Sequence, residues 1–419
     1  MKILRLTLCV LGLSVAACTG AGGAADLPTP PPAATLTRVP TQRPESTPTP
    51  LLLPTSMVTP GPTPTDNSLF AVVSADDWQS GSETAPSTLI VYSDFQCEYC
   101  ATVAPMLTLL RREYPDDFRL VFRHYPLPQH DKAILAAVGA EAAGAQDKFW
   151  EMHDLLFARQ AAWADLTEAE FQALLRGYAD ELGLEPTRFA DDLASDATEA
   201  RVIAAHAAAT AIPLPGAPFL LFNGAPIQDE RMLNHWALAT LIRLERLKGR
   251  QFTAAPPDII NPFSTYLATI TTDKGDIVIK LFAERTPLTV NNFVFLAQAG
   301  WYDGVTFHRV IPGFAAQTGD PSGTGYGGPG YFIPDESVPD LQYNAAGWVG
   351  MANSGRDTNG SQFFITLGPT PELDGKYTLF GQVVSGMEVL EALTPRDPNA
   401  NSEAPPGDVI ISITIEEQE

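Results

Sequence analysis

Two stretches of the chain show the hydrophobic patterns of folded domains. From about Asn67, a β-type run at 88–92 is followed by a helical pattern at 102–113 and a second strand pattern at 118–122. Strand, helix and strand in this order predict a βαβ unit. The Ala-rich residues 131–210 predict a set of further helices after that unit.

The second stretch has a hydrophobic pattern that predicts mostly strands. Residues 266–272 and 276–282 alternate apolar and polar positions on either side of a Gly-containing turn, which predicts a β-hairpin. Thr286 and Pro287 then open a helical pattern that runs to Ala297, because Thr caps helices and Pro suits their first turn. The remaining residues are Gly-rich and β-like without strand–helix alternation, so an antiparallel barrel is the simplest fold class.

The first 18 residues have the pattern of an export signal. Lys2 and Arg5 flank the start of an apolar run, Leu6 to Val15, which is too short to span a bilayer. The residues that follow, Ala16-Ala17-Cys18, resemble the end of a bacterial lipobox, which implies cleavage before Cys18 and lipidation of its thiol. An ordinary signal peptide with an incidental Cys is the alternative.

The segment after the signal has the composition of a spacer. Residues 26–65 hold 12 prolines and 10 threonines in 40 positions. Such a stretch cannot bury apolar surface, and it favours a semi-extended chain of roughly 3 Å per residue where polyproline II forms. We therefore expect it to hold the folded domains away from a membrane.

The net charge narrows the choice of partners. The 419 residues include 26 Lys and Arg against 49 Asp and Glu, a formal charge of −23. Residues 66–250 hold 15 basic and 27 acidic residues, and residues 251–419 hold 7 and 20, so both folded stretches are acidic. This balance argues against nucleic acid or anionic lipid as the main electrostatic partner. The four cysteines are too few for a disulfide scaffold in a chain of this length.

Cys97 and Cys100 form a C-x-x-C between the first predicted strand and its helix. In a βαβ context this motif indicates thioredoxin-like redox chemistry. A helix N-terminus supplies partial positive charge and N–H groups to a thiolate, so we expect Cys97 to attack and the more buried Cys100 to resolve the mixed disulfide. A zinc site is an alternative that lacks two further ligands. A purely structural disulfide would close a very small loop.

Two motifs far apart in the sequence give this stretch a family resemblance. Residues 93–100 (SDFQCEYC) and 216–224 (GAPFLLFNG) resemble the active-site motif and the cis-proline loop of the DsbA-like branch of the thioredoxin superfamily. Residues 147–154 resemble that family's inserted helical subdomain. The resemblance covers residues 66–250 and implies substrate-backbone contacts at Ala217 and Pro218.

Glu98 departs from the usual pattern beside the first cysteine. A carboxylate next to Cys97 should disfavour its thiolate. The Cys pair could therefore act as a dithiol oxidase, a disulfide reductase or a disulfide isomerase. The expected extracytoplasmic compartment favours the dithiol oxidase.

The second stretch resembles the cyclophilins, a family of peptidyl-prolyl isomerases. The similarity lies in residues 307–321 (FHRVIPGFAAQTGDP), 350–354, 358–365 and 373–381. It spans about residues 264–418 and implies an antiparallel barrel that isomerises X–Pro bonds. The resemblance implies Arg309 as the catalytic donor. It implies a proline pocket formed by Phe314, Met351, Phe364 and Leu373, contacts to the substrate backbone at Gln317, Ala352 and Asn353, and a further substrate contact at Tyr377.

These residue types suit prolyl isomerisation. The barrier of about 18–20 kcal/mol comes from amide resonance, so no nucleophile is needed. A fixed guanidinium that donates to the prolyl nitrogen weakens the resonance, and an apolar pocket holds the ring. The alternatives are that Phe314 and Phe364 are ordinary core residues and that Arg309 forms a surface ion pair. We expect the Gly-rich residues 319–330 to form a surface loop rather than a phosphate loop.

Several other residues qualify the interpretation. Glu372 stands where cyclophilins often have Trp, which argues against strong cyclosporin binding, and Tyr377 stands where they often have His. Tyr keeps an aromatic wall with a polar tip. We expect His308 to be a packing or hydrogen-bonded residue, and His124 either to lie near Cys97 or to sit in a solvated loop.

The sequence as a whole predicts a multidomain chain with a thioredoxin-like α/β domain that carries a helical insertion, followed by a cyclophilin-like antiparallel barrel. The expected boundaries are a lipoprotein signal and lipidation Cys at 1–18, a linker at 19–65, the first domain at 66–250, a linker at 251–263 and the second domain at 264–419.

The expected function is extracytoplasmic protein folding, by prolyl isomerisation and by thiol–disulfide exchange through Cys97 and Cys100, in a protein that is lipid-anchored to the bacterial membrane. The expected partners are unfolded or newly exported polypeptides and a membrane or soluble redox partner, with no nucleic acid, metal or cofactor. The alternatives are a peptide-binding chaperone and an isomerase gated by the redox state of the Cys pair.

Overall fold

The computed structural model describes residue 70, residues 72–401 and residues 404–418. The predicted signal peptide, Cys18 and the spacer to residue 65 lie outside the described residues. Within the described part, no helix is long and apolar enough to cross a membrane.

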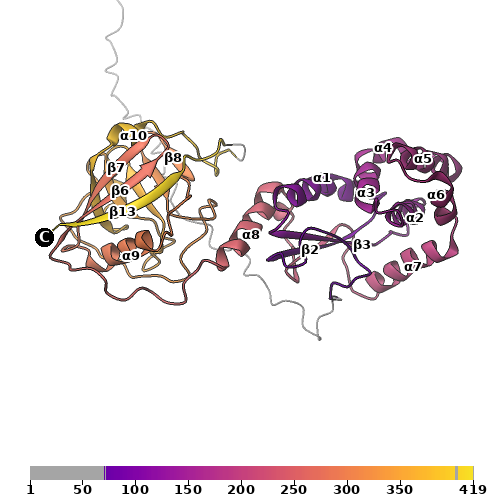
Figure 1. Ribbon diagram of the computed structural model, residues 1–419, viewed down its shortest axis with the longest axis horizontal. Coiled ribbons are helices and arrows are strands. Elements are labelled where there is room, and N and C mark those ends of the chain that lie inside the picture. Colours follow the sequence, from indigo (N-terminus) through magenta and orange to yellow (C-terminus); the bar gives the residue numbers. More distant parts are fainter. Residues whose placement is uncertain (1–69, 71, 402–403, 419) are drawn as a thin grey trace, which may run out of the picture. The chain divides into compact units, whose positions relative to one another are not determined.

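The first domain is built on a five-stranded sheet in the order β1-β3-β2-β4-β5 (Figure 1). β2 and β3 are parallel, whereas β1 and β4 join them antiparallel. The strands are β1 Trp78–Ser80, β2 Ser87–Ser93, β3 Phe118–His124, β4 Phe219–Phe222 and β5 Ala225–Pro226. The predicted βαβ unit and the thioredoxin-like α/β class are confirmed.

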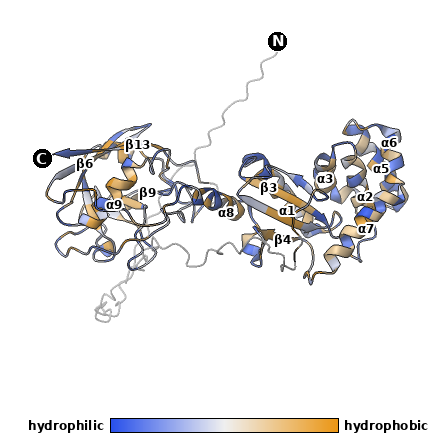
Figure 2. Cartoon of the chain, turned by 60° about the horizontal axis from the view of Figure 1, so that its bottom comes forward, coloured by the Kyte–Doolittle hydropathy of each residue, from blue (hydrophilic) through white to orange (hydrophobic). Residues whose placement is uncertain are grey.

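Eight helices accompany this sheet in the described residues, and six of them, α2 to α7, lie between β3 and β4 in the sequence. They are α1 Glu98–Glu113, α2 Ala133–Gly144, α3 Phe149–Ala158, α4 Gln160–Trp163, α5 Glu168–Glu181, α6 Pro186–Leu193, α7 Asp196–Thr210 and α8 His235–Lys248. α2 to α7 form the predicted helical insertion. β4 is hydrophobic along its length (Figure 2), and it lies between the central strand β2 and the edge strand β5.

Helix α1 begins at Glu98, four residues before the start that the hydrophobic pattern predicts. The cause is its cap. Cys97 has an extended backbone and its sulfur accepts a hydrogen bond from the backbone N–H of Cys100, so the cysteine motif itself makes the first turn. The predicted C-x-x-C therefore stands at a helix N-terminus.

The second domain is an eight-stranded sheet in the order β13-β6-β7-β12-β10-β11-β9-β8, and every neighbouring pair is antiparallel. Its strands are β6 Thr265–Thr272, β7 Gly275–Leu281, β8 Arg309–Ile311, β9 Ala315–Thr318, β10 Trp348–Met351, β11 Phe363–Thr366, β12 Leu379–Ser385 and β13 Ile410–Gln418. A bridge between Thr306 and Val409 brings the two ends of the sheet together. The predicted hairpin and antiparallel barrel are confirmed.

Short helices complete the second domain: α9 Pro287–Gln298, α10 Met387–Glu391 and the 3-10 turn η2 Pro371–Leu373, while the 3-10 turn η1 Glu230–Met232 belongs to the first domain. α9 lies along the curled sheet (Figure 1). Its Phe293 is wholly buried and its ring contacts those of Tyr302, Phe363 and Phe380, which fixes the helix to the barrel core.

The Gly-rich residues 319–330 do not form the expected surface loop. Asp320 is wholly buried. Its carboxylate accepts hydrogen bonds from the hydroxyls of Ser322 and Thr324 and from four backbone N–H groups, those of Ser322, Thr324, Gly325 and Gly327. A buried carboxylate needs such donors to offset its desolvation. The loop is therefore folded inward around one side chain.

Candidate active sites

The Cys pair lies where three segments of the first domain meet. Cys97 caps α1, and its Sγ lies 3.4 Å from the backbone N of Cys100. The Cys97 thiol also donates to the carbonyl oxygen of Ala217 at 3.5 Å. β4 pairs with β2 so that Phe219 lies opposite Tyr92, which carries the preceding Ala217–Pro218 loop, with its cis peptide bond, to the end of β2. The structure thus brings together all four residues expected at this site.

The two thiols differ strongly in acidity. A hydrogen bond from the Cys100 thiol and the backbone N–H groups of Cys100 and Tyr99 lower the pKa of Cys97 from 9.0 to about 6, while burial and the charge of Asp94 oppose that shift. Burial raises the pKa of Cys100 above its ordinary value, and so does its hydrogen bond to Cys97. Cys97 is 4% exposed and Cys100 is 1% exposed. Cys97 is therefore the thiol suited to nucleophilic attack.

The carboxylate whose charge disfavours the Cys97 thiolate is that of Asp94 rather than the expected Glu98. Asp94 is 1% exposed, and its carboxylate accepts hydrogen bonds from the backbone of Gln96 and Leu127 and pairs with His130 Nδ1, each at 2.7 Å. Glu98 is exposed in the first turn of α1. A solvated carboxylate has little influence because water screens its charge.

Gln160 is a residue at this site that the sequence reasoning missed. It lies on α4 of the helical insertion, and its Nε2 donates to the carbonyl oxygens of Phe95 at 2.7 Å and Cys97 at 2.9 Å. The insertion thereby fixes the backbone that precedes the thiol. No local signal in the sequence marks Gln160, because its partners are more than 60 residues away.

His124 does not sit in a solvated loop. It ends β3, is 3% exposed, and its Nε2 lies 3.0 Å from Glu141 Oε1. The Glu141 carboxylate also accepts a hydrogen bond from Trp78 Nε1 at 2.7 Å. The solvated-loop alternative for His124 is therefore wrong, and its partner is a buried carboxylate.

In the second domain, strand register places three of the predicted residues in one row. Arg309 on β8 lies opposite Gln317 on β9, and Gln317 lies opposite Phe364 on β11. Directly opposed residues of neighbouring strands share a face of the sheet. The guanidinium, the amide and the aromatic ring therefore line one surface. Arg309 is 6% exposed, and its Nε donates to Oδ1 of the half-buried Asp397 at 3.2 Å, so the guanidinium is buried and does not form a surface ion pair.

An apolar cluster adjoins this row. Ala352, Phe364 and Leu373 are buried in it, and Phe314 and Tyr377 pack against it partly buried. The ring of Tyr377 meets that of Phe364 edge-on at 5.6 Å between centroids. The structure thus gathers the expected ring-binding residues around Phe364, with Tyr377 as an aromatic wall.

Met351 is the exception. It lies opposite Phe363 on β11, one residue before Phe364, and both Met351 and Phe363 are wholly buried in the main barrel core. Because successive strand residues face opposite sides, Met351 points away from the surface that carries Phe364. The expected place of Met351 in the proline pocket is therefore corrected. Ala315, which the sequence reasoning missed, lies in the apolar cluster instead.

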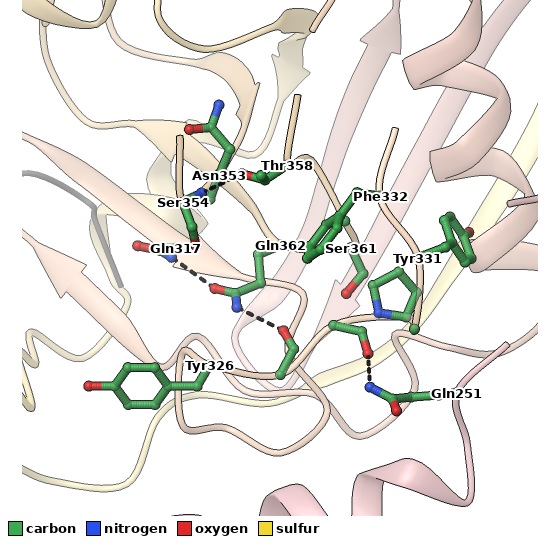
Figure 3. A pocket seen from close by; sticks show the side chains of 16 residues that line it. Gln251, Gln317, Tyr326, Tyr331, Phe332, Asn353, Ser354, Thr358, Ser361 and Gln362 are labelled. Atoms are coloured by element: carbon green, nitrogen blue, oxygen red, sulfur yellow. Dashed lines mark hydrogen bonds between the residues drawn. The ribbon is translucent and has the colours of Figure 1, made fainter. Parts of the chain in front are cut away.

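A polar network continues beyond Gln317 (Figure 3). Gln317 Nε2 donates to Gln362 Oε1 at 2.9 Å, and Gln362 Nε2 donates to the carbonyl oxygens of Gly325 and Gly327. Asn353 is 7% exposed, and its side chain bonds to Asn359 and to the carbonyl oxygen of Lys376. Gln362 was not predicted, although its spacing of two from Phe364 was a usable signal.

His308 is a buried packing residue beside Arg309. Burial lowers the pKa of His308 to about 4, and neither ring nitrogen has a hydrogen-bond partner in the described residues. The imidazole is therefore neutral at physiological pH and is no proton donor to the substrate.

Comparison with known proteins agrees with this geometry. Residues 267–415 match the family described as cyclophilin type peptidyl-prolyl cis-trans isomerase. The probable peptidyl-prolyl cis-trans isomerase A of Mycobacterium bovis is 45% identical over 172 residues, 37% of this chain and 94% of that protein. The chain belongs to the cyclophilin-type peptidyl-prolyl isomerases. The peptidyl-prolyl cis-trans isomerase-like 3 of Rattus norvegicus is 50% identical over 151 residues, 35% of this chain and 94% of that protein.

The cyclophilin domain follows a second recognisable domain. Residues 74–238 match the family described as thioredoxin, so the first domain is thioredoxin-like. Both matched ranges lie within the described residues, and residues 239–266 lie between them.

The cyclophilin site is suited to rotation about an X–Pro bond. The ion pair with Asp397 engages Nε of Arg309, and a guanidinium carries its other N–H donors on Nη1 and Nη2. A donor held in one position stabilises the pyramidal prolyl nitrogen without reorganising during the reaction. The apolar cluster around Phe364 supplies a surface for the proline ring.

Proposed function

We propose that this chain is an extracytoplasmic folding catalyst that joins prolyl isomerisation to thiol–disulfide exchange. The observation that carries the redox half is the position of Cys97: its sulfur caps α1 and lies within 3.5 Å of the carbonyl oxygen of Ala217. The clients are unfolded or newly exported polypeptides that contain X–Pro bonds and cysteines.

The exchange takes place in two substitutions at sulfur. In the oxidising direction, a client thiolate attacks the Cys97–Cys100 disulfide at Cys97, a client–Cys97 bond forms, and Cys100 leaves as a thiolate that takes up a proton. The second client thiolate then attacks the client sulfur of the mixed disulfide, and Cys97 leaves as a thiolate. A low pKa makes Cys97 a good leaving group and favours the dithiol form of the protein, which supports the oxidase direction. A membrane or soluble disulfide partner reoxidises the pair.

The redox half is tested by oxidation of a reduced two-cysteine peptide with the full chain. We expect the wild type, supplied with its Cys97–Cys100 disulfide formed, to form the peptide disulfide and become reduced, whereas Cys97→Ser and Cys100→Ser should both fail, because neither variant can hold the disulfide that accepts the two electrons. Full activity of Cys97→Ser contradicts the proposal. Reduction of insulin by the wild type without oxidation of the peptide would reverse the proposed direction.

The isomerase half is tested in a proline-limited refolding assay. Arg309→Ala should lose the acceleration, because no other group in the row formed by Arg309, Gln317 and Phe364 is a cation. Arg285→Ala is the matched control, since Arg285 forms a half-exposed ion pair with Asp340. Equal rates for the two variants would contradict the role of Arg309.

The location rests on the sequence of the first 65 residues. We propose that Cys18 carries lipid and that the Pro/Thr-rich linker holds both domains off the outer face of the bacterial membrane. Wild-type protein made in a bacterium should incorporate labelled palmitate and sediment with membranes, whereas Cys18→Ala should do neither. Unlabelled wild type in the soluble fraction contradicts the anchor.

A further inference from the structure

The loop between β3 and α2, residues 125–132, is bonded to the segment that leads into the Cys pair. Gln96 holds this loop at both its amide atoms, because its Oε1 accepts from the backbone N–H of Lys132 at 2.7 Å and its Nε2 donates to Asp131 Oδ1 at 2.9 Å. Gln96 directly precedes Cys97. The loop therefore lies alongside the backbone that carries the attacking thiol.

Asp94 is the buried centre of this contact. Its two carboxylate oxygens accept backbone N–H groups from both segments, Oδ1 from Gln96 and Oδ2 from Leu127, each at 2.7 Å. The third partner is His130, whose Nδ1 lies 2.7 Å from Oδ2 and is the donor, because an ionised carboxylate can only accept. A buried carboxylate needs such donors and an opposite charge to offset its desolvation. The loop thus supplies two of the three groups that stabilise Asp94.

His130 is the only basic side chain that bonds to Asp94 in the described part of the chain. Lys132 is close in sequence, but its Nζ donates to both carboxylate oxygens of Asp131 at 2.8 Å, so that ion pair is complete in itself. Glu98, on the other side, is exposed and its charge is screened by water. The side chain of His130 is 22% exposed, so the imidazole can exchange a proton with water while its Nδ1 stays on Asp94.

The charge of Asp94 acts on the attacking thiol. The hydrogen bond from Cys100 has the largest influence on the pKa of Cys97 and lowers it, whereas the charge of Asp94 raises it. A protonated imidazole in direct contact with a carboxylate offsets most of its charge, because opposite charges so close together act on a third group almost as a neutral pair. Imidazole is the side chain whose charge ordinarily changes between pH 5 and 8. The state of His130 therefore sets how strongly Asp94 repels a thiolate at Cys97.

We propose that His130 is a positioning residue of the redox site, which holds the carboxylate of Asp94 and offsets its charge so that Cys97 can form a thiolate. The inference deepens the proposed thiol–disulfide exchange and rests on it. His130 acts through Asp94 and needs no contact with either sulfur. Since a stabilised thiolate favours the dithiol form of the protein, protonation of His130 also makes the Cys pair a stronger oxidant.

The test measures the thiolate directly, by the pH dependence of Cys97 alkylation in the reduced full chain. We expect His130→Ala to raise the pH of half-maximal alkylation by about half to one unit, because the charge of Asp94 is then no longer offset. Asp94→Asn removes that charge, keeps an acceptor oxygen and should lower the midpoint. In the Asp94→Asn background, His130→Ala should cause no further change. At equilibrium with glutathione, His130→Ala alone should shift the protein toward its disulfide form by about threefold to tenfold.

His235→Ala is the matched control. His235 and Glu113 form the same kind of pair at 2.7 Å, but both side chains are half-exposed and Glu113 is the last residue of α1, whereas Cys97 caps its first turn. This variant should keep the wild-type midpoint. Equal midpoints for His130→Ala and His235→Ala overturn the proposal, and so does a shift by His130→Ala that is the same with and without the charge of Asp94.

His130→Asn is a second variant, which keeps an amide donor near the position of Nδ1 without the charge. Its midpoint should lie between those of the wild type and His130→Ala, and where His130→Ala does not fold, an unchanged midpoint for His130→Asn overturns the proposal. Alkylation needs no client and no turnover. A wild type that oxidises no peptide therefore overturns the exchange activity itself, and the midpoints distinguish that failure from a failure of the role of His130.

Discussion

The buried Arg309 and the half-buried Asp397 form an ion pair in which Nε of the guanidinium lies 3.2 Å from Oδ1 of the carboxylate. The contact is built by the backbone: Val310 and the neighbouring Arg396 exchange two hydrogen bonds, which place residue 397 beside residue 309. Asp397 therefore acts on the isomerase through Arg309, as a positioning residue.

Removal of this carboxylate should impair catalysis more than binding. We expect Asp397→Ala to lower kcat/KM by about tenfold, mostly through kcat, because a donor that is free to move is poorly placed in the transition state. Asp397→Asn keeps an acceptor oxygen and should recover most of the rate. Asp340→Ala, which removes the exposed partner of Arg285, is the control. A rate for Asp397→Ala equal to this control would show that the pair is only structural.

The acidity of Cys97 predicts its reactivity with pH. In the reduced protein, alkylation of Cys97 by iodoacetamide should be half-maximal near pH 6, because its pKa is lowered to about 6, and Cys100 should stay unreacted at pH 7. The depressed pKa also stabilises the reduced fold above the ordinary thiol pKa of 9.0, and this contribution is lost as the pH falls through 6. A midpoint above pH 8 by mass spectrometry of the alkylated peptide would contradict this assignment.

Gln160 should matter for both the stability and the reactivity of the first domain. Gln160→Leu leaves the carbonyl oxygens of Phe95 and Cys97 without this donor, which should cost about 1–3 kcal/mol in the free energy of unfolding. The displaced backbone should also slow alkylation of Cys97. Gln228→Leu replaces an exposed Gln of the same domain and should change neither quantity. Urea titration measures the first effect, and agreement of the two variants would rule out the role of Gln160.

Two helical glycines should respond in opposite directions to the same substitution. Gly177 on α5 is exposed and has open space around its Cα, so Gly177→Ala should stabilise the domain by about 0.5–1 kcal/mol. A Cβ at Gly144 would collide with the ring of Trp78, which stacks on Phe149 at 4.2 Å between centroids and cannot move freely. Gly144→Ala should therefore destabilise by about 1–3 kcal/mol. Thermal unfolding of both variants tests the pair, and shifts of equal sign would contradict it.

The sequence predicted features that depend on local pattern. Alternation along residues 266–282 gave the hairpin, and the C-x-x-C placed Cys97 at a helix start. Helix α1 still began earlier than the hydrophobic period, because the cap is a sulfur and not one of the usual capping side chains. Gly-rich composition suggested a surface loop at 319–330, whereas one buried carboxylate, Asp320, folds it inward.

Features that depend on distant partners were missed or misplaced. Met351 stands in a motif beside Ala352 and Asn353, but only the pairing of β10 with β11 shows that it faces the barrel core. Asp397 lies 88 residues from Arg309 and carries no motif. The prolines of residues 251–263 predict a linker, and only contacts with residues 77 positions away show that Gln251 and Phe252 bond to the barrel domain.

The cap of α1 ties the integrity of a helix to the oxidation state of the protein. In the reduced protein the Cys97 sulfur, as a thiolate, both accepts the N–H of Cys100 and places a negative charge at the positive end of the helix dipole. A disulfide sulfur carries no charge and is a weaker acceptor, so each turnover should weaken and restore this cap. The first turn of α1 is therefore most stable in the dithiol state. The rate of hydrogen exchange at the backbone N–H of Cys100 should follow the redox state of the Cys97–Cys100 pair.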